Sequence, residues 1–248
     1  MAHKTLVGGT AYDTKGGRCL VNGTGYSIKK GRTLMNGTGY DINFTAVLGT
    51  MKEGDIVLLN ENGSLVEFYV AKHNYESGLN GSGRTLVVRK DCYDSRQWNS
   101  TNKNAYAESA IDIFLNGEYK ALLDADIQSA IGTTTFYYTI GNGDNNVTTL
   151  TRSIFLLSST ELGGADVYNN VEGSVLPIYE TLNIAYLNGN ATTQWTRTPD
   201  TTGTSSVRRL NAKGTHMASN ANDTNGSRPA FTLPSTLVIG DDGVVSIS

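Results

Sequence analysis

One short motif occurs three times in the first forty residues. Leu-Val-Gly-Gly-Thr-Ala-Tyr begins at Leu6, Leu-Val-Asn-Gly-Thr-Gly-Tyr at Leu20 and Leu-Met-Asn-Gly-Thr-Gly-Tyr at Leu34, which gives a period of 14 residues. Asn-Gly between β-forming residues is the strongest short signal of a β-hairpin, so each repeat predicts one hairpin. Three such hairpins contain too few apolar side chains for a core of their own. We therefore expect residues 1–44 to form a small all-β module that packs on copies of itself or on another protein; the alternative is a β-meander cap on the main domain.

Residues 45–248 contain no linker and predict one further domain of the α+β class. The segments 55–59 and 65–71 flank an Asn-Gly turn and predict a hairpin, and residues 84–90 predict a third strand. The continuously apolar segment 153–158 predicts a central, buried strand.

Two segments between these strands have helical periodicity. Residues 107–115 and 119–131 each place their Ile, Leu and Phe side chains on one helical face. We therefore expect two helices in this domain.

The segment 196–225 is rich in Thr, Ser, Asn, Asp and Gly, with Val207, Leu210 and Met217 as its main apolar anchors. It is predicted to be a long solvent-facing loop, and loops of this length are uncommon unless they function. Small polar side chains with occasional Arg and His are suited to an adaptable recognition surface.

Charge and hydropathy exclude several classes of partner. Charged residues make up 17% of the chain and the net charge is −3, so no basic field exists to bind nucleic acid or an anionic membrane. The N-terminus has no apolar signal-peptide region, and no apolar run is long enough to span a membrane. We expect synthesis in a bacterial cytoplasm without membrane insertion. Cys19 and Cys92 form no redox or zinc motif; two reduced thiols are favoured, and one long-range bridge stays open.

The sequence contains little that indicates catalysis. His3, His73 and His216 are the only histidines and none has the spacing of metal ligands, so no metal and no cofactor are expected. Nucleophile, phosphate-loop and dinucleotide motifs are absent. Glu108 and Asp112 are spaced i, i+4 on a predicted helix and form the one carboxylate pair that would suit glycoside hydrolysis; a solvated helix face is favoured.

Five motifs occur in an order that resembles a known domain family. They are Trp98, Glu108-Ser109-x-Ile111-x-x-Phe114-Leu115-Asn116, Ile154-Phe155-Leu156-Leu157-Ser158-x-x-Glu161, Trp195-Thr196-Arg197-Thr198-Pro199 and Arg228-Pro229-Ala230-Phe231. The resemblance covers roughly residues 50–235 and is to a family without assigned enzymatic function in phages, prophages and gut bacteria. That family is similar to the C-type-lectin-like fold of ligand-binding proteins whose C-terminal region is diversified by retroelements. The N-terminal repeats resemble the heads of phage virion proteins.

The resemblance implies a C-type-lectin-like α+β domain with two helices and an antiparallel sheet over residues 45–248. The calcium-dependent sugar signatures are absent, and no cysteine lies beyond Cys92, so neither calcium-mediated sugar binding nor formylglycine chemistry is expected. Scaffold roles are expected for Trp195, Arg197, Arg228 and Phe231, which hold the ends of the variable segment. The candidate ligand contacts are Thr198, Asp200, Ser205, Arg208, Asn211, His216, Asn220, Asn222 and Asn225.

Together these observations predict a phage virion protein that binds a host-surface protein or glycan and is not an enzyme. Residues 1–44 would attach it to other virion proteins and make it a homo-oligomer, and its location would be the virion. Two alternatives stay open: a hydrolase acting on bacterial surface polysaccharide through residues such as Glu108 and Asp112, and a virion decoration protein without a ligand.

Overall fold

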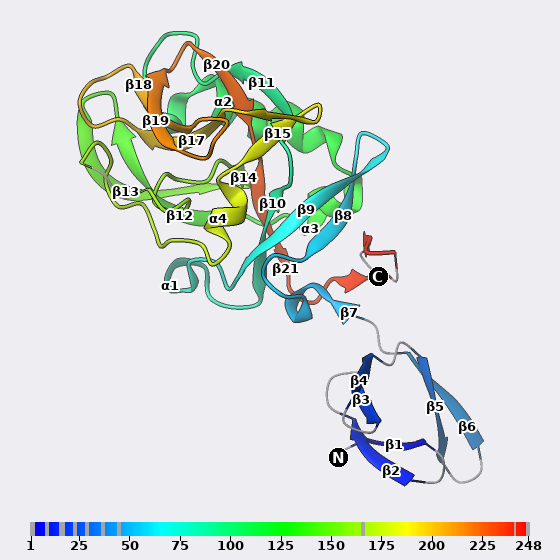
Figure 1. The fold of residues 1–248 in the computed structure, drawn as a ribbon. Helices are drawn as coiled ribbons and strands as arrows, with labels where there is room; N and C mark the ends of the chain where they lie inside the picture. The colour runs from blue at the N-terminus through cyan, green and yellow to red at the C-terminus, as the bar shows by residue number, and fades with distance from the viewer. Residues whose placement is uncertain are drawn as a thin grey trace. The chain divides into compact units, whose positions relative to one another are not determined.

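The computed structural model describes residues 46–164, 167–240 and 242–246 with their side chains, and the backbone of six strands before residue 44 (Figure 1). The chain divides into two compact units, Met1–Ala46 and Val47–Ser248. Each unit is described here by itself.

The first unit has one β-hairpin per sequence repeat. The pairs are β1 (His3–Val7) with β2 (Thr10–Thr14), β3 (Arg18–Val21) with β4 (Thr24–Ser27), and β5 (Lys30–Met35) with β6 (Thr38–Asn43) (Figure 1). Val7 pairs with Thr10, and the equivalent pairs in the next two hairpins are in the same register. The three predicted hairpins are therefore confirmed in the backbone, although the Gly-Gly and Asn-Gly turn residues lie outside the described residues.

A five-stranded sheet with the order β14-β21-β10-β9-β8 forms the centre of the second unit. Its strands are β8 (Ile56–Glu61), β9 (Ser64–His73), β10 (Arg84–Arg89), β14 (Ile154–Phe155) and β21 (Ala230–Pro234). The predicted hairpin is confirmed: Asn62 and Gly63 join β8 to β9, and both have the positive φ of a type I′ turn. The third predicted strand is also confirmed as β10.

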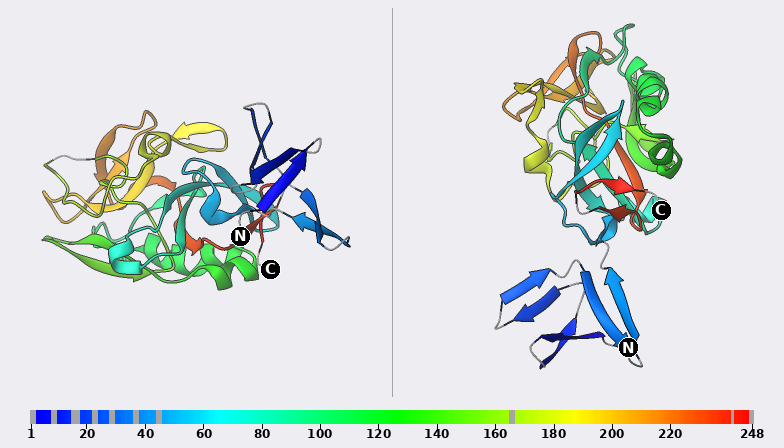
Figure 2. Two further views of the ribbon diagram at one scale, coloured as in Figure 1. Left: turned by 90° about the horizontal axis from the view of Figure 1, so that it is seen from below. Right: turned by 90° about the vertical axis from the view of Figure 1, so that its right-hand side faces the viewer.

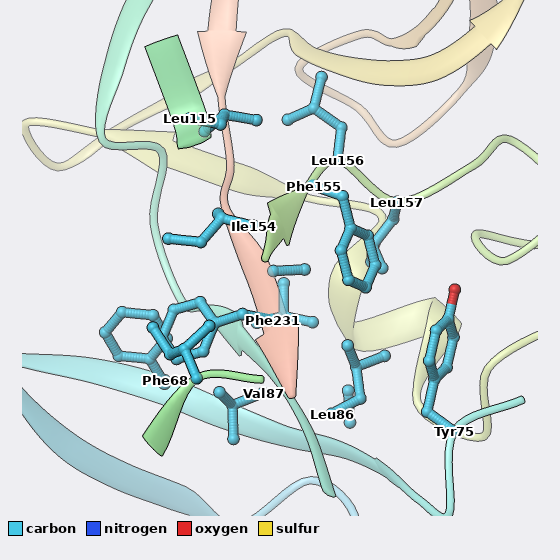
Figure 3. Packing of buried hydrophobic residues seen from close by; sticks show 14 of the residues in the cluster. Phe68, Tyr75, Leu86, Val87, Leu115, Ile154, Phe155, Leu156, Leu157 and Phe231 are labelled. Carbon is cyan, nitrogen blue, oxygen red and sulfur yellow. The ribbon is translucent and has the colours of Figure 1, made fainter. Parts of the chain in front are cut away.

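The core of this unit packs against that sheet (Figure 3). The ring of Phe68 lies 5.5 Å from that of Phe231, and the ring of Phe155 lies 4.5 Å from that of Phe136. The apolar segment 153–158 is buried as predicted, but its central position is wrong. Only two of its residues pair, at the edge of the sheet, because the chain turns away after Phe155.

The polar segment 196–225 is mostly β-structure, so the prediction of a long loop is wrong. A second five-stranded sheet has the order β11-β20-β17-β18-β19. Its strands are β11 (Asp94–Gln97), β17 (Gln194–Pro199), β18 (Ser206–Leu210), β19 (His216–Asn220) and β20 (Thr224–Ser227). Val207 and Leu210 are fully buried and anchor β18, whereas Met217 is exposed and anchors nothing.

The predicted helices are present only as short pieces. Helix α2 (Ala110–Phe114) continues into a π turn over Leu115–Tyr119 and a 3-10 turn over Lys120–Leu122, before helix α3 (Ala125–Ala130) begins. The side chain of Asn116 explains the break. Its amide donates to the Ile154 carbonyl at 2.9 Å and its oxygen accepts from the Ile154 amide at 3.1 Å, so this turn is held by β14.

The other elements are short. They are α1 (Ser77–Asn80), α4 (Tyr179–Leu182), the 3-10 turns Leu48–Thr50 and Tyr106–Glu108, the hairpins β12 (Thr134–Gly141) with β13 (Asp144–Arg152) and β15 (Ala185–Leu187) with β16 (Asn190–Thr192), and the strands β7 (Ala46–Val47), β22 (Val238–Ile239) and β23 (Val245–Ser246). Figure 2 shows residues 110–130 on one side of the second unit and β15–β19 on the other.

The expected fold class, an α+β domain of C-type-lectin-like type with two helices and one antiparallel sheet, is contradicted. Strands contain 42% of the residues and helices 17%, and the strands form several antiparallel sheets. The physical reasons are the broken helical region and the pairing of the polar segment 196–225. Within the described part of the chain, no helix has the length and apolar character needed to cross a membrane.

Candidate binding surface

A buried ion pair supports the second sheet from below. Arg197 on β17 donates from Nη1 and Nη2 to the two carboxylate oxygens of Glu161, at 2.8 and 3.0 Å, and both side chains have no exposed surface. Arg197 also donates to the carbonyls of Leu156 and Tyr137, and its guanidinium lies 4.5 Å from the ring of Phe136. These contacts fix the position of β17 against the core.

A second buried carboxylate, Glu172, lies beside this pair. It accepts hydrogen bonds from the Thr139 amide at 2.7 Å and from the Thr198 hydroxyl at 2.6 Å. Burial raises the pKa of Glu172, and the charge of Arg197 opposes that shift. Thr198 therefore serves the interior of the domain.

The four residues with predicted scaffold roles are all buried, which confirms that part of the prediction. Trp195, Arg197, Arg228 and Phe231 are at most 3% exposed. Trp195 donates from its indole nitrogen to the Arg96 carbonyl at 2.9 Å, which ties β17 to β11.

Four of the nine predicted ligand contacts have side chains in the interior: Thr198, Asp200, Arg208 and Asn225. Asp200 and Arg208 form an ion pair at 3.1 Å between Oδ2 and Nη1. Asn225 accepts from the Thr193 hydroxyl at 2.5 Å. Ligand contact through these four side chains would require the sheet to open.

The other five predicted contacts reach solvent. Ser205, Asn211 and His216 are half-buried, whereas Asn220 and Asn222 are exposed. His216 is within hydrogen-bond distance of the Ser159 hydroxyl through Nδ1, at 3.0 Å, and of the Leu162 carbonyl through Nε2, at 3.1 Å. It thus joins β19 to the turn at residues 158–164.

The exposed side chains of this segment follow its outermost strand. The edge surface, as we name it, comprises Asn211, Lys213, Thr215, Met217, Asn220 and Asn222. Strand β19 is the last strand of the sheet, so this surface lies along a sheet edge. The sequence pattern did not single out Lys213 or Thr215 and placed Met217 in the core, although Met217 is 43% exposed.

The carboxylates considered for hydrolysis do not form a matched pair. Asp112 is 3% exposed and accepts from Arg152 Nε at 2.8 Å, and burial raises the pKa of its carboxyl group. Glu108 is exposed. Among the residues that the structure describes, no group of His, Cys, Asp and Glu side chains has the arrangement of a metal site.

Residues 82–235, more than half of the chain, match the family described as a domain of unknown function, DUF6273. The chain belongs to the DUF6273 family. Comparison with curated proteins gave no match, and comparison with solved structures gave none either. The DUF6273 segment begins just before β10 and ends just after β21, so it contains both the buried ion pair and the edge surface.

Proposed function

We propose that this DUF6273 protein is a phage virion adhesion protein that binds a protein or glycan of the host surface through its edge surface. The observation that supports this proposal is a contrast along one segment. All six residues of β17 are buried, whereas β19 and its turns expose amide, hydroxyl, ammonium and thioether groups. Amide and hydroxyl side chains offer adaptable hydrogen bonding, and Met adapts to apolar surfaces of different shapes.

Rigid support strengthens the case for recognition. A binding surface is most effective when packing holds it in place before the ligand arrives, because less conformational entropy is then lost on binding. The Arg197–Glu161 pair and the His216 contacts hold β17 and β19 to the turn at residues 158–164.

The experiment compares two sets of alanine substitutions in the full chain. Replacing Asn211, Met217, Asn220 and Asn222 together removes the edge surface, and the expected result is loss of adsorption to bacterial cells and their extracted surface polysaccharides. Exposed polar side chains change stability by no more than about 0.5 kcal/mol each, so the melting temperature is expected to stay within a few degrees. The matched control replaces Tyr186 and Asn190, which are exposed on β15 and β16.

Three outcomes would contradict this proposal. They are undiminished adsorption by the edge-surface variant, equal loss in the control variant, and release of saccharide products, which would favour a hydrolase.

The same proposal assigns attachment and oligomerisation to residues 1–44. Two-stranded hairpins are marginally stable alone, and this segment consists of three of them. Deletion of residues 1–44 is expected to leave a folded monomer in light scattering that no longer joins the particle. A truncated protein with the oligomeric state of the full chain would refute this assignment.

A further inference from the structure

A groove of about 440 Å³ opens at the second unit, away from the residues of the edge surface. It is lined by Glu76, Tyr137, Val147, Val171, Gly173 and Ser174. Three of these side chains are large, apolar and exposed: Tyr137 on β12, Val147 on β13 and Val171, which is 73% exposed. Grouped exposed apolar side chains mark sites of interaction, because burying them against a partner is favourable.

Glu76 supplies an unsatisfied charge at this groove. Its Oε1 atom is shielded from solvent and has no hydrogen-bond partner among the described residues. A buried acceptor without a donor is costly, and more so when it belongs to a carboxylate. The neighbouring Glu161 is compensated by Arg197, whereas no ion pair of the described residues includes Glu76.

The backbone at Glu76 is unusual for its residue type. Its φ of +45° lies in the left-handed region, which residues with a long side chain rarely adopt. Asn80 holds the turn that follows, since its amide donates to the Thr135 carbonyl at 2.8 Å and accepts from the Thr135 amide at 2.8 Å. Strained residues that are held in this way concentrate at ligand sites.

Gly173 leaves the space that the carboxylate occupies. Its φ is +87°, and a Cβ atom there would lie 2.9 Å from Glu76 Oε1. Backbone of residue 173 can therefore approach the carboxylate without a side chain covering it. The orphan oxygen, the strained backbone and the small neighbour are three separate features at one end of the groove.

We propose that this groove binds a lysine side chain of a partner polypeptide. The ammonium group donates to Glu76 Oε1, and the four-carbon stem packs along Tyr137, Val147 and Val171. A single free oxygen suits the compact ammonium of lysine, whereas the guanidinium of arginine requires two acceptors in a fork. The exposed Val175 continues the apolar surface beyond the groove, which a polypeptide covers and a free amine does not.

The experiment uses the full chain with labelled valine methyl groups and follows the signals of Val147 and Val171 by NMR. The probes are a short blocked peptide with one lysine between two valines, the same peptide with norleucine in place of lysine, and butylamine. The lysine peptide is expected to give saturable shifts, with at least about tenfold weaker binding for the norleucine peptide, which lacks the charged hydrogen bond. Butylamine is expected to bind more weakly than the lysine peptide.

Two variants separate the charge from the surroundings. Glu76→Gln is expected to weaken the lysine peptide by at least about tenfold, whereas Glu118→Gln, at an exposed carboxylate elsewhere, is expected to change nothing. Equal binding of the lysine and norleucine peptides to the unaltered protein, or no shift with either, would overturn the proposal even if Glu76→Gln failed to fold. Butylamine binding as tight as that of the lysine peptide would overturn the polypeptide source. Replacing the edge surface is expected to leave this binding intact, so failure here and failure of the adhesion proposal are distinguishable.

Discussion

Arg197 and Glu161 form a two-pronged ion pair from which solvent is entirely excluded. The pair joins β17 to the turn at residues 158–164, and the hydroxyl of Tyr75 donates to the same carboxylate. Buried charges cost several kcal/mol of solvation free energy each, so the arrangement is stable only while both partners are present.

Removing one partner should therefore be severely destabilising. Arg197→Met is expected to lower the free energy of unfolding by about 3–5 kcal/mol, because it leaves the Glu161 carboxylate buried without its cation. Urea denaturation of the full chain measures this. Glu67→Gln is the control, since it breaks the half-exposed Lys90–Glu67 pair and is expected to cost no more than about 1 kcal/mol. A loss for Arg197→Met as small as the control would contradict the prediction.

Two buried aromatic side chains hold the ends of the segment that contains the edge surface. Trp195→Ala or Phe231→Ala is expected to lower the free energy of unfolding by about 3–5 kcal/mol, because each leaves a large cavity in the core. Tyr186→Ala, at an exposed aromatic residue, is expected to change it by no more than about 0.5 kcal/mol. Chemical denaturation compares the three variants, and equal losses at Trp195 and Tyr186 would refute this account.

Local sequence signals predicted the parts of the fold that local geometry determines. The Asn62-Gly63 turn between alternating strands predicted β8 and β9, and the repeat predicted three hairpins. The sheet that contains β17–β20 was missed because its partners come from distant parts of the chain: β11 pairs with β20, more than 120 residues away. Thr, Ser and Asn residues look alike in a loop and in such a strand.

The candidate site was predictable to a similar extent. Exposed Asn220 and Asn222 lie in the predicted segment, whereas Asp200 and Arg208 are buried against each other. Asn225 and Thr198 are buried because their partners are Thr193 and Glu172, which no short motif connects to them. Glu76 carried no sequence signal, since its distinguishing features are a backbone angle and a missing partner.

Burial controls the chemistry of Cys92. Desolvation raises the pKa of its thiol to about 11, and the side chain is 2% exposed. In a Cys19→Ser variant, which leaves Cys92 as the one thiol, thiol reagents at pH 8 are expected to react slowly with the native chain and fast after denaturation. A colorimetric thiol assay with and without denaturant measures both rates. Equal rates would mean that Cys92 is accessible in the folded state.

The pH dependence of stability provides a test of Glu172. Burial raises the pKa of this carboxyl group in the folded state above its ordinary value of about 4.3, so the folded chain retains the proton more readily than the unfolded chain does. The contribution of Glu172 to stability is therefore fully present below the ordinary pKa and declines as the pH rises through the folded-state pKa. Relative to Glu172→Gln, the unaltered protein is expected to lose stability as the pH increases from about 4 towards neutrality. Urea denaturation across that range measures the difference, with Glu118→Gln as the exposed control. If the unaltered protein instead gains stability on Glu172→Gln as the pH rises, the folded-state pKa is lowered and the hydrogen bonds from Thr139 and Thr198 outweigh desolvation.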